Sequence, residues 1–178
     1  MFSPREKVVY PGHGVAEISR VIEKKFGNNV TQFFELKFLD SDMTILVPVA
    51  NLTSVGIRKV SSNKIIDELF KMLSAPDASI KAATSCNNSC GSNWGKRYKK
   101  YQGKIKTGDP LKIGDIYRDL NFLATRKELS FGEKSLLQKI EHLLAQEISI
   151  VISVDEQQAI AELRSQCKMI KQSAVRTA

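Results

Sequence analysis

A tryptophan followed by a run of cations is the feature of this sequence best suited to chemistry. Trp94 is the chain's only tryptophan and lies in the stretch GSNWGKRYKKYQGK. The cations that follow it closely, with no acidic residue among them, are Lys96, Arg97, Lys99 and Lys100. An indole can stack on a nucleic-acid base or insert at a base step, and neighbouring cations can hold the phosphates on either side. The pattern therefore predicts a nucleic-acid contact in which Trp94 stacks and the four cations hold phosphates.

The same residues also fit a second interpretation, in which the tryptophan is buried. On a helix, Trp94, Tyr98, Tyr101 and Ile105 fall at i, i+4, i+7 and i+11, which is one stripe. Aromatic stripes usually pack into a core, and the lysines would then form the solvated face of the helix. Two features favour exposure of the tryptophan itself: it lies in the first turn, and Gly95 leaves open space beside it. Both interpretations stay open from the residues alone.

The cysteines and histidines offer little other chemistry. Three cysteines in a chain without an export signal indicate free thiols, and Cys86 and Cys90 could hold zinc only with two further ligands. We interpret His13, in a Gly-His-Gly turn, as a structural residue and His142 as a surface or packing residue. A thiol enzyme is a further hypothesis, although no base accompanies either cysteine. We therefore expect a binding protein rather than an enzyme, with no metal site and no cofactor.

Composition favours a globular protein with an anionic partner. The chain has 178 residues, of which 42% are hydrophobic and 26% charged, which suits one or two small domains. Its formal net charge is +8 and its pI is about 9.4, which favours nucleic acid over an anionic membrane surface as the partner. No apolar run approaches the roughly 20 residues of a membrane span, and the first residues do not form a secretory signal. We therefore expect a cytoplasmic protein with no membrane partner.

Residues 1–62 alternate short β-rich runs with turn signals, which is typical of a small antiparallel barrel. Turns are indicated where Gly, Pro, Asn and Asp gather, at residues 11–14, 27–29 and 40–42. The expected strands are Val8–Tyr10, Val15–Phe26, Thr31–Leu39, Met43–Val49 and Leu52–Val60. The expected core side chains are Tyr10, Phe34, Phe38 and Val47.

After residue 62 the apolar pattern changes to the helical period. Ser62 and Asn63 are candidate caps for a first helix, and a linker rich in Ser, Ala and Asn follows it. Four more helices are expected, the first from about residue 93 to about residue 107. Cap signals open the other three: Asp109 with Pro110, Ser130 with Glu133, and Ser153 with Glu156. We therefore expect an α+β protein of two domains, with a β-barrel domain at 1–62, a helix and linker at 63–92, and a basic helical domain at 93–172.

Several motifs, in their order along the chain, resemble the CarD/CdnL family of bacterial transcription regulators. In the first domain these are KVVYPGHGV (Lys7–Val15) and MTILVPVANLTSVGIR (Met43–Arg58). In the second they are NWGKRY (Asn93–Tyr98), KIKTGD (Lys104–Asp109), IYRDL (Ile116–Leu120) and LSFGEKSLL (Leu129–Leu137). A piece such as YPxHG is moderately specific, whereas the order across both domains is highly specific. The first domain alone is also similar to the polymerase-binding module of the transcription–repair coupling factor.

The resemblance implies a division of labour between the domains. An N-terminal Tudor-like barrel would bind the protrusion lobe of the RNA polymerase β subunit, and a C-terminal α-helical bundle would contact promoter DNA at the upstream edge of the transcription bubble. Trp94 matches the family's tryptophan that wedges into the minor groove at that edge. Arg97 matches a basic residue that contacts phosphate, with Lys96 and Lys99 assisting. The resemblance thus implies a protein, expected to be monomeric, that stabilises the open promoter complex without reading sequence.

The resemblance also implies polymerase contacts on two strands of the first domain, near Lys24 and Phe26 and at Leu46, where some relatives have arginine. Lys24 would supply a charge and Phe26 an apolar anchor; the alternative from the residues alone is an exposed hairpin end. The sequence departs from the family in the longer linker before Trp94 and in Gly95, which stands in place of serine. An alternative function is a polymerase-binding adaptor without direct DNA contact.

Overall fold

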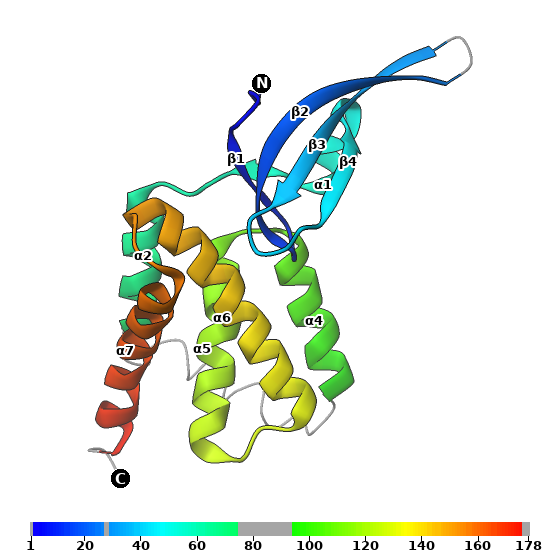
Figure 1. Cartoon of the computed structure of the whole chain (residues 1–178). Coiled ribbons are helices and arrows are strands. Elements are labelled where there is room, and N and C mark those ends of the chain that lie inside the picture. Colours follow the sequence, from blue (N-terminus) through cyan, green and yellow to red (C-terminus); the bar gives the residue numbers. More distant parts are fainter. Residues whose placement is uncertain (1, 27–28, 75–93, 176–178) are drawn as a thin grey trace.

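The computed structural model describes residues 2–26, 29–74 and 94–175 and has an α+β fold. An antiparallel sheet lies at one end of the molecule, and the longer helices lie together at the other (Figure 1). The α+β class predicted from the sequence is confirmed. The expected linker lies outside the described residues.

The sheet is open, with its five strands in the order β4-β3-β2-β1-β5 and every pairing antiparallel. The strands are β1 (Lys7–Tyr10), β2 (Gly14–Phe26), β3 (Asn29–Phe38), β4 (Thr44–Pro48) and β5 (Arg58–Lys59). Side chains alternate between the two faces of a strand, so Phe34 and Phe38 of β3 lie in one core with Val47 of β4. Tyr10 packs against that core. The expected core residues are therefore confirmed, whereas closure of the sheet into a Tudor-like barrel is not.

The predicted strand Leu52–Val60 is wrong over most of its length. The chain there forms a 3-10 helix and a short α-helix, η1 (Val49–Asn51) and α1 (Leu52–Val55). Gly56 ends α1 with a φ of 80°, in the left-handed region that favours glycine, and its N–H donates to the carbonyl oxygen of Leu52. Leu52 and Val55 both pack against the sheet core. These apolar residues therefore satisfy the i, i+3 spacing of a helix, and only β5 pairs as a strand.

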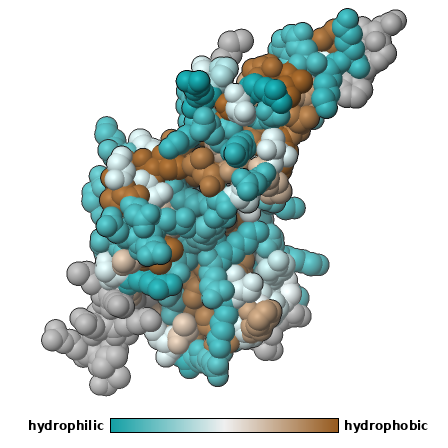
Figure 2. Space-filling view, in the orientation of Figure 1, coloured by the Kyte–Doolittle hydropathy of each residue, from teal (hydrophilic) through white to brown (hydrophobic). Residues whose placement is uncertain are grey.

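Strands β2 and β3 form a long hairpin that extends beyond β4 and away from the helices (Figure 1). Lys24 lies opposite Thr31 toward the far end of this hairpin, whereas β4 pairs with β3 only as far as Phe33. Apolar side chains are visible among hydrophilic ones on the sheet end of the molecule (Figure 2), and Val21 and Val30 are exposed on the hairpin. The hairpin is therefore an arm with much of its surface open to a partner.

The helices share one apolar core, centred on α6. They are α2 (Asn63–Ser74), α4 (Trp94–Lys106), α5 (Pro110–Arg126), α6 (Phe131–Ile152) and α7 (Glu156–Val175). Leu69, Leu120 and Ile140, from three different helices, are fully buried in this core. Helix α6 contacts α5, α7 and the strand β2 (Figure 1), so it joins the two parts of the molecule. The finer geometry of a helical bundle stays a prediction.

None of the helices in the described ranges combines the length and the hydropathy that a membrane span requires.

Of the three cap signals predicted for the last three helices, two are confirmed. The carboxylate of Asp109 accepts a hydrogen bond from the backbone N–H of Leu111 at 3.0 Å, ahead of a proline in the first turn of α5. Ser130 and Glu133 form both halves of a capping box at the start of α6. Such a box satisfies N–H groups that a helix end otherwise leaves unpaired, so the first turn of α6 is fixed.

The third predicted cap, a box of Ser153 and Glu156, is wrong. Ser153 has a φ of 56° and its N–H donates to a carbonyl oxygen of α6, so it ends that helix. Asp155 lies just before α7, and its carboxylate accepts a hydrogen bond from the N–H of Gln157 at 3.2 Å. The turn between the two helices is so short that the serine closes α6 and an aspartate caps α7 in its place.

The sheet and the helices meet where two neighbouring residues of α6 contact the β-strands. The side-chain oxygen of Gln146 accepts a hydrogen bond from the N–H of Val15 at 3.2 Å. Glu147 binds two guanidinium nitrogens of Arg58, at 2.6 and 2.7 Å, and the Arg58 Nε donates to the carbonyl oxygen of Gly108 at 2.7 Å. A planar, two-point contact of this kind fixes direction as well as distance. It holds α6, and therefore the site at its other end, in a defined orientation to the sheet.

Candidate nucleic-acid interface

Helix α4 buries one half of its aromatic stripe and leaves the other at the surface. Tyr101 and Ile105 lie in the helical core, whereas Tyr98 is 41% exposed and Trp94 is half-buried. The core thus anchors the C-terminal half of α4 and leaves its first turn at the rim. The interpretation of the stripe as buried core therefore describes Tyr101 and Ile105, and the interpretation of it as exposed describes Trp94 and Tyr98.

The indole of Trp94 rests on the first turn of α6. A Cβ atom at Gly132 would lie only 3.2 Å from the indole Nε1 and 3.3 Å from Cζ2, so the absence of a side chain lets the ring approach this closely. The ring of Tyr98 lies 5.3 Å from that of Trp94, centroid to centroid, at an angle of 46°. These contacts position the indole while part of it stays accessible to solvent.

Arg97 joins α4 to the same turn of α6. Its Nη2 lies 2.6 Å from Oε1 of Glu133, a carboxylate only 1% exposed. Lys127 also pairs with Glu133 at 3.3 Å, and the N–H of Ser130 donates to it at 2.9 Å. Burial opposes ionisation of Glu133, but the hydrogen bonds from Ser130 and Lys127 outweigh it, so the pKa of this carboxyl lies below its usual value. The sequence identified Glu133 as a cap but gave no sign of its pairing with Arg97.

Three lysines of α4 lie on the surface without an ion pair among the described residues. Lys96, Lys99 and Lys100 are exposed, and no carboxylate in the described ranges lies within ion-pair distance of them. Lys104, one turn further on, differs in that it pairs with Asp115 at 3.4 Å. The structure therefore brings three of the four predicted phosphate contacts to one exposed helix face, while the fourth, Arg97, already holds a buried partner.

The predicted polymerase contacts lie on the sheet, apart from one another. Leu46 is exposed on the edge strand β4, opposite Glu35, and Lys24 is exposed on the arm. The side chain of Phe26 lies outside the described residues. The carboxylate of Glu35 accepts two hydrogen bonds from Arg20, from Nε at 2.8 Å and from Nη2 at 3.2 Å. This contact holds the pKa of the Glu35 carboxyl below its usual value. Sequence reasoning missed this ion pair beside Leu46. The signal that could have found it is the register counted from the hairpin turn, since Arg20 and Glu35 pair in the same register as Phe26 and Asn29.

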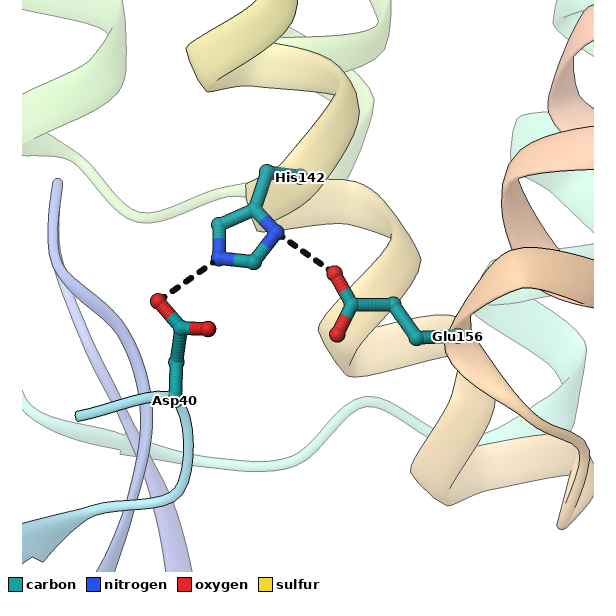
Figure 3. Close-up of side chains that lie close together, drawn as sticks. All are labelled: Asp40, His142 and Glu156. Carbon is teal, nitrogen blue, oxygen red and sulfur yellow. Dashed lines mark ion pairs between the residues drawn. The ribbon is translucent and has the colours of Figure 1, made fainter.

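His142 of α6 bridges the sheet and α7. Its Nε2 lies 2.9 Å from a carboxylate oxygen of Asp40, in the turn after β3, and its Nδ1 lies 2.5 Å from one of Glu156 (Figure 3). Burial lowers the pKa of this imidazole, but the two carboxylates outweigh burial and raise it above its usual value. The two ring nitrogens face different carboxylates, and Nε2 also lies 2.9 Å from the side-chain nitrogen of Gln146, so His142 links the turn after β3 to α7. Sequence reasoning assigned His142 to surface or packing, since its partners come from distant segments.

Two family models match the chain, one after the other. The model described as "CarD-like/TRCF RID domain" matches residues 2–61, and the model described as "CarD, C-terminal domain" matches residues 79–164. The chain belongs to the CarD family. A relative from Bacillus subtilis (strain 168), named "Putative transcription factor YdeB", is 26% identical over 158 residues, which cover 89% of this chain and 97% of the relative.

Membership of the CarD family makes this protein a transcription regulator of the kind that interacts with RNA polymerase, and neither matching model describes an enzyme. The matches assign no role to single residues. The roles of Trp94 and its cations, and of the residues expected to contact polymerase, therefore stay predictions.

Proposed function

We propose that this protein stabilises the open promoter complex by binding two partners at once. The sheet, at residues 1–62, binds the protrusion lobe of the RNA polymerase β subunit, and the helices, at 93–172, bind promoter DNA at the upstream edge of the bubble. The observation that carries the proposal is the position of Trp94, a half-buried indole supported by Gly132. Beside it are exposed lysines that form no ion pair with any residue in the described ranges. In this role the protein is a monomer that works on the nucleoid together with polymerase.

Trp94 acts in this proposal as a wedge against re-closing of the bubble. Re-pairing at the edge regains roughly 1–2 kcal/mol of stacking per base step. An aromatic ring stacked on a base contributes about 1–3 kcal/mol, which is a comparable amount. Because Gly132 and Tyr98 already position the indole, little conformational freedom is lost when it binds. An indole at the edge therefore lengthens the life of the open state.

The exposed lysines of α4 hold phosphates in this proposal, independently of sequence. Lys96, Lys99 and Lys100 lie at i, i+3 and i+4, so they share one helix face. Contacts of this type release counterions from DNA and weaken steeply as salt rises. Arg97 adds a phosphate contact only through donor groups that Glu133 does not use, so its main effect is to hold α4 against α6.

In this proposal the sheet binds polymerase and so places the helices near the bubble. Strand β4 is at an edge of the sheet, with backbone groups available to pair with a strand of the β subunit. Leu46 on that strand, and Lys24 and Phe26 on the arm, provide the side-chain contacts. Tethering to polymerase raises the local concentration of the helices near the bubble, so a weak affinity for DNA is sufficient.

The test is the lifetime of a polymerase–promoter open complex after a competitor challenge. Wild-type protein lengthens this lifetime, and Trp94→Ala loses most of the effect while it still binds polymerase. Replacing Lys96, Lys99 and Lys100 together by alanine shortens the lifetime and flattens its dependence on salt. The matched control replaces Lys64 and Lys71, exposed lysines of α2, and leaves the lifetime unchanged. A folded Trp94→Ala variant that performs like wild type would overturn the proposal.

A second candidate function is a polymerase adaptor without DNA contact. It is favoured by the packing of Trp94 on Gly132 and by the pairing of Arg97 with Glu133, which are both internal contacts. The two candidates differ in tryptophan fluorescence. The DNA-contact proposal expects acrylamide quenching of Trp94 that falls when a fork-junction DNA is added, whereas the adaptor expects quenching that the DNA does not change.

A further inference from the structure

Phe131 is exposed to an extent that separates it from the other large apolar side chains. It is 88% exposed, whereas the next most exposed large apolar residue among those described, Val30, is 55% exposed. Isolated exposed apolar residues are common on protein surfaces, so exposure alone decides nothing. The position of this phenylalanine is what suggests a role, because Phe131 is the first residue of α6 and the direct neighbour of Gly132.

The backbone of Phe131 lies next to the indole of Trp94. The Cα atoms of consecutive residues are about 3.8 Å apart. The indole of Trp94 approaches within 3.2 Å of the place where a Cβ of Gly132 would lie. The two aromatic side chains therefore occupy one end of the helical part, Trp94 from α4 and Phe131 from α6.

The backbone that carries Phe131 is held firmly. Ser130, directly before it, forms the capping box with Glu133, and that buried carboxylate also binds Arg97 and Lys127. Contacts from Ser130, Arg97 and Lys127 thus fix the first turn of α6, so the backbone of Phe131 is rigid. A rigid, exposed aromatic ring binds at a low cost in conformational entropy.

The charges around Phe131 favour an anionic partner. Lys134 lies at i+3, on the same side of α6, and Lys127 precedes the helix by four residues. Lys134 pairs with Glu128, but that carboxylate is 86% exposed, and a surface pair of this type exchanges readily for a phosphate. Together with the lysines of α4, these cations border an aromatic pair, which is the composition of a surface that stacks bases and holds a phosphate backbone.

We propose that Phe131 is a second aromatic contact to DNA, which stacks on a base or base step next to the one that Trp94 engages. This inference rests on the proposed DNA contact of Trp94 and extends it from one ring to two. The two rings stand on different helices, joined by the contact of Arg97 with Glu133. The pair therefore presents a fixed spacing to the DNA at the edge of the bubble.

The first test identifies what Phe131 touches. Phe131→p-benzoyl-phenylalanine, placed in the full chain and bound to a polymerase–promoter complex, forms a photo-crosslink on illumination. The proposal expects a crosslink to promoter DNA at the upstream edge of the bubble. A crosslink to a polymerase subunit alone, or no crosslink from a complex that contains the protein, would overturn it. The same photoreactive residue in place of Ile152, at the other end of α6, is the control and should not crosslink to DNA.

The second test measures the contribution of Phe131 to the open complex. Phe131→Ala shortens the competitor-resistant lifetime by about fivefold, the lower end of the range for one stacked base, and Phe131→Trp restores it. With Phe131→Leu the lifetime stays short, because leucine keeps the apolar bulk but has no aromatic face. If Trp94→Ala shortens the lifetime and Phe131→Ala does not, this inference is wrong and the proposed function stands. If neither variant shortens it, both fail.

Discussion

Arg97 of α4 binds the buried Glu133 of α6, with 2.6 Å between Nη2 and Oε1, and so joins the helix that carries Trp94 to the turn that supports its indole. The same carboxylate completes the capping box with Ser130. One buried charge thus sets the start of α6 and the position of α4 at once. The geometry of the proposed DNA contact depends on it.

Glu133→Gln should lower the free energy of unfolding by about 1–3 kcal/mol, since it leaves Arg97 and Lys127 without their charged partner. The measurement is urea unfolding of both proteins across a range of pH. Because the pKa of Glu133 is lowered on folding, its stabilisation is present above the unfolded value and is lost as the pH falls through the folded value. The difference between the variants should therefore shrink in acid.

The control for this prediction is Glu128→Gln, which removes a carboxylate that also pairs with a lysine but is 86% exposed. It should leave the unfolding midpoint at neutral pH unchanged. An equal loss of stability in both variants would mean that net charge, and not the buried contact, is responsible.

Gly132→Ala should move the indole of Trp94 without destabilising the fold. Alanine is a better helix former than glycine, but its Cβ would lie 3.2 Å from Nε1, so the ring has to shift outward by a few tenths of an ångström. We expect stronger acrylamide quenching of Trp94, a shorter open-complex lifetime, and an unchanged or higher melting temperature. Gly103→Ala, in α4, is the control because nothing lies within 4 Å of its Cβ position. A quenching change in both variants would contradict this account.

Local signals predicted the parts of the fold that depend on neighbours in sequence. The cap residues Asp109 and Ser130 act through atoms two or three residues away, and both are confirmed. The strand predicted over Leu52–Val60 failed because apolar residues three apart also satisfy a helix, and packing on the sheet core decides between the two. The box at Ser153 failed because the same residue was needed to end the preceding helix.

The supporting residues of the candidate site could not be predicted in this way. Trp94 and its lysines stand out by type and spacing, so sequence reasoning found them. Gly132 and Glu133 lie nearly 40 positions further on, and their contacts with α4 depend on how two helices pack. A glycine and a glutamate in a capped first turn carry no separate signal of that role.

Arg58→Ala should destabilise the protein by about 3 kcal/mol, because it leaves the nearly buried Glu147 as an unpaired charge between the sheet and the helices. The measurement is urea unfolding, together with the open-complex lifetime at a temperature where the variant is folded. We expect a shorter lifetime as well, since the contact fixes α6 relative to the sheet. Arg20→Ala is the control, because its partner Glu35 lies on the same sheet but Arg20 is 68% exposed. It should leave the unfolding midpoint unchanged.

His142→Gln should remove a pH-dependent part of the stability. The unfolded imidazole has a pKa of about 6.5, and Asp40 and Glu156 raise the folded value above this. Between the two pKa values the folded protein therefore holds a proton that the unfolded chain has released. The stabilisation is therefore complete below the unfolded pKa and is lost as the pH rises through the folded one. Urea midpoints measured from about pH 5.5 to pH 9 should show the two proteins converging at high pH. A His142→Gln variant with the same pH profile as the wild type would show that the bridge contributes nothing.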